Sequence, residues 1–249
     1  MRLEISTATT QGPRRYQEDR CSSFKLKPYF KHIAHVLAVM DGHSGSEVAI
    51  LCEDELAKIF SAKKFLSPEK LLKEVVAELA TKTSGMVSGS TISIALVLPH
   101  QKKVVISILG DSPIIVKGRD GSIFVSPEHN VRTNQVEREE AVRRGGFYMG
   151  GYICDCATGS GLQLSRALGD THLGNIISRL PYITTINIKG GSFVLVCSDG
   201  LIDPSRKSQD SVPRIIELIE QGANAEQLII DAEQKGLRDN ASAVLCRVL

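Results

Sequence analysis

Apolar residues follow two spacings along the chain, and each spacing predicts one kind of secondary structure. Within residues 90–98 apolar side chains occupy every second position, and residues 37–40 are apolar throughout. Short runs of this kind predict buried strands. Between residues 45 and 60, apolar side chains recur at intervals of three and four, which places them on one face of a helix. The chain therefore combines strands with helices.

Turn residues and helix caps divide the rest of the chain into further elements. Strands are expected at residues 2–10, 21–26, 35–40, 90–98, 102–109, 114–116, 123–125, 183–188, 193–197 and 243–249. Helices are expected at 45–60, 67–82, 133–144, 211–221 and 225–235, and the glycine-rich stretch 150–161 is expected to be a mobile surface loop. Because the strands cluster and the helices come in pairs, the pattern favours an α+β fold of packed sheets with outer helices over a parallel doubly wound sheet.

The composition is that of a globular protein with a sizeable core. Hydrophobic residues make up 42% and charged residues 23% of the 249 residues. Neither an internal repeat nor a linker interrupts the pattern, so we expect one domain over residues 1–249. The formal net charge of +2 gives no field strong enough to predict a nucleic-acid or membrane partner.

Cysteine usage and the amino-terminal residues bear on the cellular compartment. The six cysteines are scattered without the spacing of a metal site, and the chain does not start with the apolar segment of a signal peptide. No apolar run reaches the roughly 20 residues that a membrane helix needs. These features predict reduced thiols and a cytoplasmic location, with the nucleus left open as a second one.

Acidic residues stand at the ends of several expected strands. Three apolar strands stop at an aspartate, and two other strands start just after acidic residues. These residues are Asp41, Asp111 and Asp199 at strand ends, and Glu18, Asp19 and Asp239 at strand starts. In an antiparallel sheet the end of one strand and the start of its neighbour share an edge, so we expect these carboxylates to meet. Taken singly, Asp41-Gly42 is better explained by an ordinary Asp-Gly turn that closes a strand, and only the repetition of carboxylates at other strand ends favours a shared site.

A cluster of carboxylates requires a cation. Two carboxylates about 4 Å apart repel each other by ~4 kcal/mol at an effective dielectric constant near 20. Oxygen donors without a nearby cysteine or histidine pair favour magnesium or manganese over zinc. Two such ions ~3.5–4 Å apart can share a water molecule and lower its pKa from about 15.7 towards about 7. The strand-end carboxylates therefore predict hydrolysis by metal-activated hydroxide.

Two further side chains near the same edge suit a phosphate substrate. The planar guanidinium of Arg14 can bind phosphate through two hydrogen bonds, and His43 can protonate a leaving oxygen. On the residues alone, a surface arginine and a turn histidine explain them equally well.

Competing chemistries are excluded because their sequence motifs are missing. The chain has no Cys-x5-Arg loop, no Gly-x-Ser-x-Gly elbow, no Walker-type loop, no dinucleotide-binding glycine motif and no Asp-x-Asp nucleophile pair.

Seven motifs in order along the chain resemble those of the metal-dependent serine/threonine phosphatases of the PPM, or protein phosphatase 2C, family. They are Arg14-x-x-x-Glu18-Asp19, Asp41-Gly42-His43-x-Gly45, Ser88-Gly89-Ser90-Thr91, Gly110-Asp111-Ser112, Leu164-x-x-x-x-Leu168-Gly169-Asp170 with Ser165-Arg166-Ala167 inside it, Ser198-Asp199-Gly200-Leu201-x-Asp203 and Asp239-Asn240. Each motif alone is weak, whereas the ordered set spans nearly the whole chain. The resemblance implies a four-layer αββα sandwich of two mainly antiparallel sheets flanked by helices.

The resemblance also implies a cofactor and a set of ligands. It implies a binuclear Mn²⁺ or Mg²⁺ centre whose bridging hydroxide attacks phosphoserine and phosphothreonine. The implied roles, by position, are Asp41 bridging both ions, the Gly42 carbonyl and Glu18 on one ion with Asp19 acting through water, Asp199 and Asp239 on the other ion, Asp111 on a third, weaker ion, Arg14 on the phosphate and His43 as general acid. Residues 133–161 resemble the family's variable flap, which borders the substrate groove.

Three departures from the family's motifs leave every implied ligand in place. They are Ser44 for the usual glycine, Pro113 for the usual arginine, and Ala241-Ser242 for the commoner apolar-Thr pair. These departures bear on efficiency more than on activity. The first hypothesis is thus an active, monomeric protein phosphatase acting on phosphoproteins. The alternatives are a weak or inactive pseudophosphatase that serves as a binding module, and a phosphatase for small metabolites.

Overall fold

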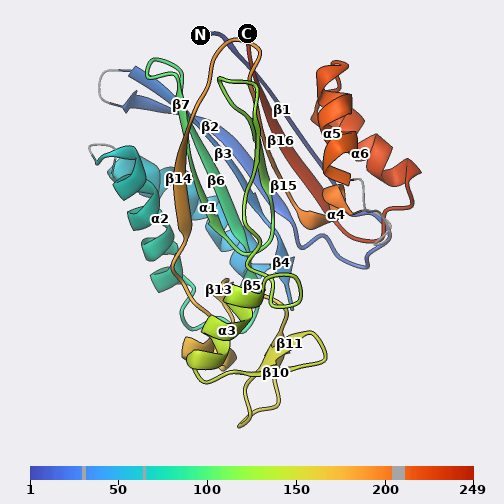
Figure 1. Ribbon diagram of the computed structural model, residues 1–249. Helices are drawn as coiled ribbons and strands as arrows, with labels where there is room; N and C mark the ends of the chain where they lie inside the picture. Colours follow the sequence, from blue (N-terminus) through green and yellow to red (C-terminus); the bar gives the residue numbers. More distant parts are fainter. Residues whose placement is uncertain (30–31, 64–65, 204–210) are drawn as a thin grey trace.

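Two five-stranded sheets lie face to face in the computed structural model (Figure 1). The structure describes residues 1–29, 32–63, 66–203 and 211–249. The first sheet has the order β14 (Tyr182–Asn187), β7 (Lys103–Leu109), β6 (Ile92–Leu98), β3 (His32–Met40) and β2 (Arg20–Tyr29). The second has the order β1 (Leu3–Thr10), β16 (Ala241–Val248), β15 (Phe193–Cys197), β8 (Ile114–Lys117) and β9 (Ile123–Val125). Neighbouring strands in both sheets run antiparallel.

Helices cover the outer face of each sheet. The first sheet packs against α1 (Glu47–Ala62) and α2 (Pro68–Lys82), and the second against α5 (Ser211–Glu220) and α6 (Ala225–Gln234) (Figure 1). In the described part of the chain, no helix combines the length and the apolarity needed to cross a membrane.

Strand β3 shows how the sequence builds these layers. Val36, Ala38 and Met40 pack towards α1 and α2, whereas Leu37 and Val39 pack into the core between the two sheets. Successive side chains of a strand point to opposite faces, so a wholly apolar strand has two apolar neighbours. The α+β class and the αββα arrangement expected from the sequence are therefore confirmed, and the expected strands and helices are present with boundaries shifted by a few residues.

The strands bring several chain segments to one end of the sandwich. Arg20, the first residue of β2, pairs with Met40, the last residue of β3. In the other sheet Cys197, the last residue of β15, pairs with Ala243 near the start of β16. Both chain termini lie at the opposite end (Figure 1). The residues that flank these strand ends therefore share one end of the molecule.

A small third sheet lies at this same end and was not expected from the sequence. It consists of β13 (Leu168–Gly169), β5 (Gly89–Ser90) and β4 (Gly42–His43). The short helix α4 (Asp199–Ile202) follows β15 directly, and the 3₁₀ segment η1 (Thr171–Ile176) follows β13. Strands of two residues carry no hydrophobic period, which explains why pattern reasoning missed them.

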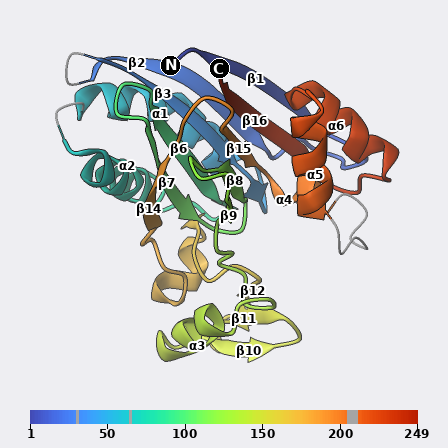
Figure 2. The same ribbon diagram turned by 45° about the horizontal axis from the view of Figure 1, so that its top comes forward.

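The flap-like region forms a separate small unit beyond the ends of the sheets (Figure 2). It contains α3 (Gln135–Arg143), β10 (Phe147–Met149), β11 (Tyr152–Cys154) and β12 (Gly161–Leu162). The stretch 150–161 is thus not simply a loop, because β11 pairs with both β10 and β12. Ile153 is buried in a cluster with Ala141 of α3, and Tyr148 packs against that cluster, which gives the hairpin a core of its own.

Candidate metal and phosphate site

Four aspartates surround a fifth at the end of the sandwich where the strands stop. Asp41 follows β3 directly. Its burial raises its pKa well above the usual range, and the charges of the four other aspartates raise it further. Those four are Asp19, Asp199, Asp111 and Asp239. The structure thus brings the aspartates of strand ends and strand starts together, and their mutual repulsion is what a bound cation would relieve.

Two other motifs hold the backbone of Asp41. Its N–H donates to Oγ1 of Thr91 over 3.0 Å, and its carbonyl accepts from the Thr91 N–H over 2.9 Å and from the Ser90 hydroxyl over 3.2 Å. The Thr91 hydroxyl lies 2.7 Å from the hydroxyl of Ser112. Residues 88–91 and 110–112 therefore act as a scaffold that fixes where Asp41 stands.

Asp19 is buried, with 2% of its surface exposed, and is tied to the second sheet. The Ser198 hydroxyl donates to its Oδ2 over 2.7 Å and accepts from the Ser242 N–H over 2.9 Å. Burial raises the pKa of Asp19 to about 6, against the opposing effect of its hydrogen bonds to Ser198 and Ser242 and with a further upward contribution from the charge of Asp239. Ser198 therefore links an expected metal ligand of one sheet to β16 of the other.

Glu18 lies beside the Asp-Gly-His turn. Its Oε1 accepts a hydrogen bond from the Gly45 N–H over 2.7 Å. Its own N–H donates to Oδ1 of Asn240 over 2.9 Å, and the Asn240 amide donates to the carbonyls of Gln11 and Tyr16. Asn240 thus fastens the segment that carries Glu18 to the start of β16, while Gly42 pairs with Ser90 in the small sheet.

A pocket of about 600 Å³ opens at Asp111, Asp199 and Asp239. Asp111 accepts a hydrogen bond from the Asn130 amide over 2.9 Å. Burial raises its pKa, as does the charge of Glu128, while the Asn130 hydrogen bond acts in the opposite direction. The remaining lining residues are Pro113, Glu128, Asn130, Arg132, Thr133, Gln163, Gly200, Ile202 and Asp203. The pocket therefore places the expected ligands next to the flap-like region.

Arg14 lies at the carboxylate end, as a phosphate-binding residue must. Its guanidinium forms an ion pair with Asp239, and its Nε donates to the carbonyl of Arg238 over 3.3 Å. The same carboxylate is an expected metal ligand. In this arrangement Arg14 supplies part of the positive charge that the cluster of aspartates requires.

The donor set fits Mg²⁺ or Mn²⁺ by its chemistry. Carboxylate oxygens are the hard ligands these ions prefer, and the gathering of charge around Asp41 needs a cation. Within the described ranges, no three His, Cys, Asp or Glu side chains are already arranged to hold an ion. The carboxylates of Glu18, Asp19 and Asp111 instead accept hydrogen bonds from neighbouring protein groups. The ligand assignments therefore stay a prediction.

His43 has a partner that the sequence did not indicate. Its Nε2 lies 2.9 and 3.0 Å from the two carboxylate oxygens of Asp170, which is only 1% exposed. Gly89 lies between these side chains, because β5 pairs with both β4 and β13. A Cβ on Gly89 would stand 2.2 Å from both His43 Nε2 and Asp170 Oδ2. The small sheet therefore brings this histidine and this carboxylate into contact, and the contact requires a glycine at position 89.

Several residues that support the expected site residues through hydrogen bonds were not predicted from the sequence. Thr91, Ser198, Asn240 and Asp170 all lie inside the motifs named above, but none of them was expected to have a function there. All four are buried polar residues, which fold stably only when their hydrogen bonds are satisfied. Their positions beside the expected ligands were the available signal.

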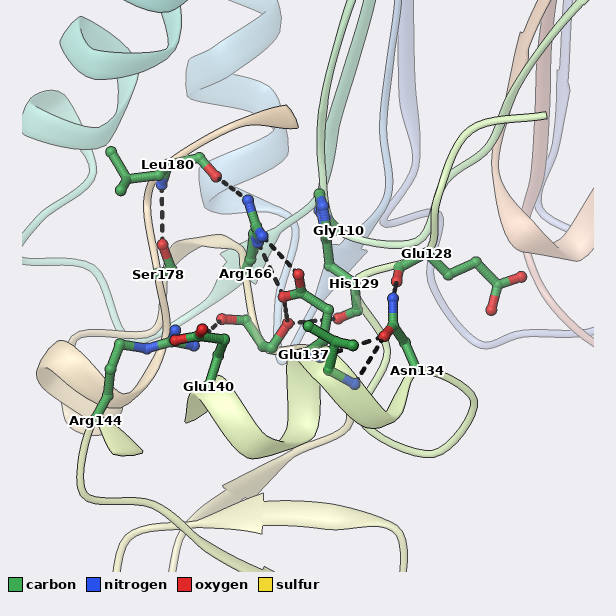
Figure 3. A network of polar contacts seen from close by, with 12 residues as sticks. Gly110, Glu128, His129, Asn134, Glu137, Glu140, Arg144, Arg166, Ser178 and Leu180 are labelled. Atoms are coloured by element: carbon green, nitrogen blue, oxygen red, sulfur yellow. Dashed lines mark hydrogen bonds and ion pairs between the residues drawn. The ribbon is translucent and has the colours of Figure 1, made fainter. Parts of the chain in front are cut away.

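The flap-like region is anchored by a buried ion pair (Figure 3). Glu137 of α3, 5% exposed, accepts from Nε and an Nη of Arg166 over 2.9 and 2.5 Å and from the hydroxyl of Ser165 over 2.5 Å. His129 lies in the same network, and its Nδ1 accepts from the Gly110 N–H over 3.1 Å. The network therefore joins α3 to the strand end that carries Asp111.

Comparisons with solved structures identify the class to which this fold belongs. Among solved structures, the chain resembles a C. elegans sex determining protein with a TM-score of 0.82 and 24% identity, covering 98% of this chain and 64% of that one. It resembles serine-threonine phosphatase 2C from Toxoplasma gondii with a TM-score of 0.75 and 19% identity, covering 98% and 94% of the two chains. At these identities the likeness establishes the fold.

The sequence comparisons establish the family. The model of the family described as Protein phosphatase 2C matches residues 6–241. The chain is 27% identical over 236 residues to Probable protein phosphatase 2C 3 of Oryza sativa subsp. japonica, covering 86% of this chain and 48% of that protein. It is 26% identical over 254 residues to Probable protein phosphatase 2C 71 of Arabidopsis thaliana, covering 97% and 55%. The chain belongs to the protein phosphatase 2C family, and it spans about half the length of these two relatives.

Proposed function

We propose that this protein hydrolyses phosphoserine and phosphothreonine in phosphoproteins. The observation that carries the proposal is the convergence of four aspartates on Asp41. Three of the four, Asp111, Asp199 and Asp239, line a pocket large enough for a phosphorylated side chain. When bound, two Mn²⁺ or Mg²⁺ ions lower the pKa of a water molecule and so supply the nucleophile. Family membership supports the same activity.

The chain's own residues bind the metal ions, orient the phosphate and protonate the leaving oxygen. The ions would be held by Asp41, Glu18, the Gly42 carbonyl, Asp199 and Asp239, with Asp19 acting through water and Asp111 helping to hold a third, weaker ion. Arg14 orients the phosphate. To bind it, the Arg14 guanidinium gives up its ion pair with Asp239. His43, held by Asp170, delivers a proton to the leaving oxygen.

The proposal is tested with p-nitrophenyl phosphate and a phosphothreonine peptide. We expect Mn²⁺-dependent hydrolysis of both, its loss in EDTA, and its loss in Asp41→Asn. The matched control is Asp54→Asn, because Asp54 is an exposed aspartate on α1. Wild-type protein without activity in excess Mn²⁺, or an Asp41→Asn variant with undiminished activity, contradicts the proposal. A strong preference for small phosphate esters over the peptide would indicate a metabolite phosphatase instead.

A phosphopeptide-binding module is the second candidate, and one observation favours it. Arg14 already neutralises Asp239, which lowers the need for a metal ion at that carboxylate. A binding module would retain phosphopeptides without releasing phosphate, even in excess Mn²⁺. The same assay, run alongside a binding measurement, separates the two functions.

We further propose that residues 1–249 act as one catalytic domain with residues 133–161 as its flap. The proposed partners are phosphoprotein substrates, and the proposed state is a monomer in the cytoplasm, with the nucleus as a second location. Analytical ultracentrifugation of the full chain tests the monomer.

A further inference from the structure

The pocket beside the expected metal ligands is strongly acidic. Its charged lining includes five carboxylates, those of Asp111, Glu128, Asp199, Asp203 and Asp239. Among the lining residues that the structure describes, Arg132 is the sole cation. Asp239 is paired with Arg14, which is not one of the lining residues. Because a phosphorylated peptide is anionic, Arg132 is the lining side chain that attracts it.

Arg132 is positioned by both the sandwich and the flap-like region. Its N–H donates to Oδ1 of Asn130 over 3.0 Å, and the Asn130 amide donates to Asp111. Its side-chain stem lies on Gly151 of the β10–β11 turn, where a Cβ would come within 3.1 Å of Arg132 Cγ and Cδ. Gly151 has a φ of +93°, a conformation that favours glycine. The missing side chain of Gly151 thus leaves room for the aliphatic part of the Arg132 side chain.

Among the residues that the structure describes, the guanidinium of Arg132 has no hydrogen-bond, ion-pair or aromatic partner, unlike the guanidinium groups near it. Arg166 pairs with Glu137, Arg143 pairs with Glu140, and Arg138 lies over the ring of Tyr148, 4.7 Å from its centroid. For Arg132, no side-chain hydrogen bond or ion pair forms with any residue in the described ranges. It is therefore an exposed cation, anchored through its stem, at the edge of an acidic pocket.

We propose that Arg132 binds a second anionic group of the substrate, next to the phosphate that is hydrolysed. A guanidinium forms charge-assisted hydrogen bonds with carboxylate and phosphate alike, so the group is an acidic side chain or a neighbouring phosphorylated residue. This specificity rests on the proposed phosphatase function. It selects substrates phosphorylated within acidic or multiply phosphorylated segments.

The test compares peptides that share one phosphothreonine. One peptide has neutral flanking residues, one carries a glutamate, one carries a phosphoserine analogue that resists hydrolysis, and one carries a lysine, each moved stepwise along both flanks. Wild-type protein is expected to favour the best acidic peptide over the neutral one by roughly five- to tenfold in kcat/KM, the effect of one charge-assisted pair. The effect is expected in KM, and a phosphate should give the larger preference because it carries about −1.5 to −2 charges.

Variants assign the preference to the residue. Arg132→Gln is expected to abolish the preference, Arg132→Lys to retain part of it, and Arg138→Gln, whose guanidinium rests on Tyr148, to retain all of it. An equal kcat/KM for all peptides in wild-type protein, a preference for the lysine peptide, or a full acidic preference in Arg132→Gln overturns the inference while leaving the phosphatase function standing. Complete lack of Mn²⁺-dependent turnover in wild-type protein, on these peptides and on p-nitrophenyl phosphate, overturns the proposed function and this specificity with it.

Discussion

His43 and Asp170 form a contact that joins two motifs 127 residues apart, with Nε2 of the histidine 2.9 Å from Oδ2 of the carboxylate. Asp170 adopts a left-handed backbone conformation with φ of 49°, directly after β13. A non-glycine residue in that conformation costs roughly 1–2 kcal/mol, so the surrounding structure must hold it there. We infer that Asp170 is a positioning residue that sets the orientation of the His43 ring.

Asp170→Asn should therefore impair hydrolysis in a way that depends on the leaving group. An alkoxide from phosphothreonine needs a proton to leave, whereas p-nitrophenolate leaves without one. If Asp170 positions the proton donor, the substitution lowers kcat on a phosphothreonine peptide by roughly 10- to 100-fold and has a much smaller effect on p-nitrophenyl phosphate. An equal loss on both substrates would show instead that Asp170 only supports the fold.

Gly89→Ala should disrupt the same contact from the opposite side. The added Cβ would stand 2.2 Å from His43 Nε2 and from Asp170 Oδ2, so the two side chains must separate. We expect a loss of peptide hydrolysis at least as large as in Asp170→Asn, together with lower thermal stability. Gly85→Ala is the matched control, because nothing lies within 4 Å of a Cβ there. If both alanine variants keep full activity, the contact is not needed for turnover.

Metal binding should be visible as stability, independently of activity. A ligand at about 100 times its dissociation constant stabilises the folded state by about 2.7 kcal/mol, so excess Mn²⁺ is expected to raise the Tm of wild-type protein over that in EDTA. Asp41→Asn removes one of five mutually repelling carboxylates. It is expected to raise the Tm in EDTA by about 2–4 °C, which corresponds to about 1 kcal/mol, and to lose most of the response to Mn²⁺.

Thermal unfolding of wild type, Asp41→Asn and Asp54→Asn in EDTA and in MnCl₂ checks both halves of this expectation. Asp54→Asn should behave as wild type under both conditions. A Tm for Asp41→Asn that rises with Mn²⁺ as much as that of wild type would contradict the role of Asp41 as the shared ligand.

The strand ends could be predicted from the sequence because long apolar runs define them. The run that ends at Met40 is buried on both faces, and the polar residue after it, Asp41, is where the strand leaves the core. Antiparallel pairing then decides which other carboxylates share its edge. These are local patterns joined by one general rule of sheet geometry.

The contact between His43 and Asp170 could not be predicted in this way. It depends on β4, β5 and β13, which are each two residues long and carry no period. It also depends on Gly89 having no side chain, which becomes meaningful only when its neighbours in space are known. Ser44, which replaces the usual glycine of the family, likewise reveals its backbone conformation only in the structure. Its φ of +57° lies in the left-handed region that favours glycine.

The buried network at the base of the flap-like region should make the protein less stable in mild acid. Burial, and next the charge of Arg166, lower the pKa of His129 from 6.5 to about 4. The unfolded chain therefore binds a proton more readily than the folded one between these values, and stability falls as the pH falls through that interval. At about pH 5 the loss relative to pH 7 is roughly 2 kcal/mol for this residue. Protonation of Glu137 lowers the stability only at a lower pH: burial raises its pKa, but hydrogen bonds from Arg166 and Ser165 outweigh burial and hold the pKa below the usual value.

Urea unfolding at pH 5 and pH 7, in wild type and in His129→Gln, measures the difference in the free energy of unfolding between the two pH values. This difference should be smaller in the variant by about 2 kcal/mol. An identical pH dependence in both proteins would show that the fold does not lower the pKa of His129.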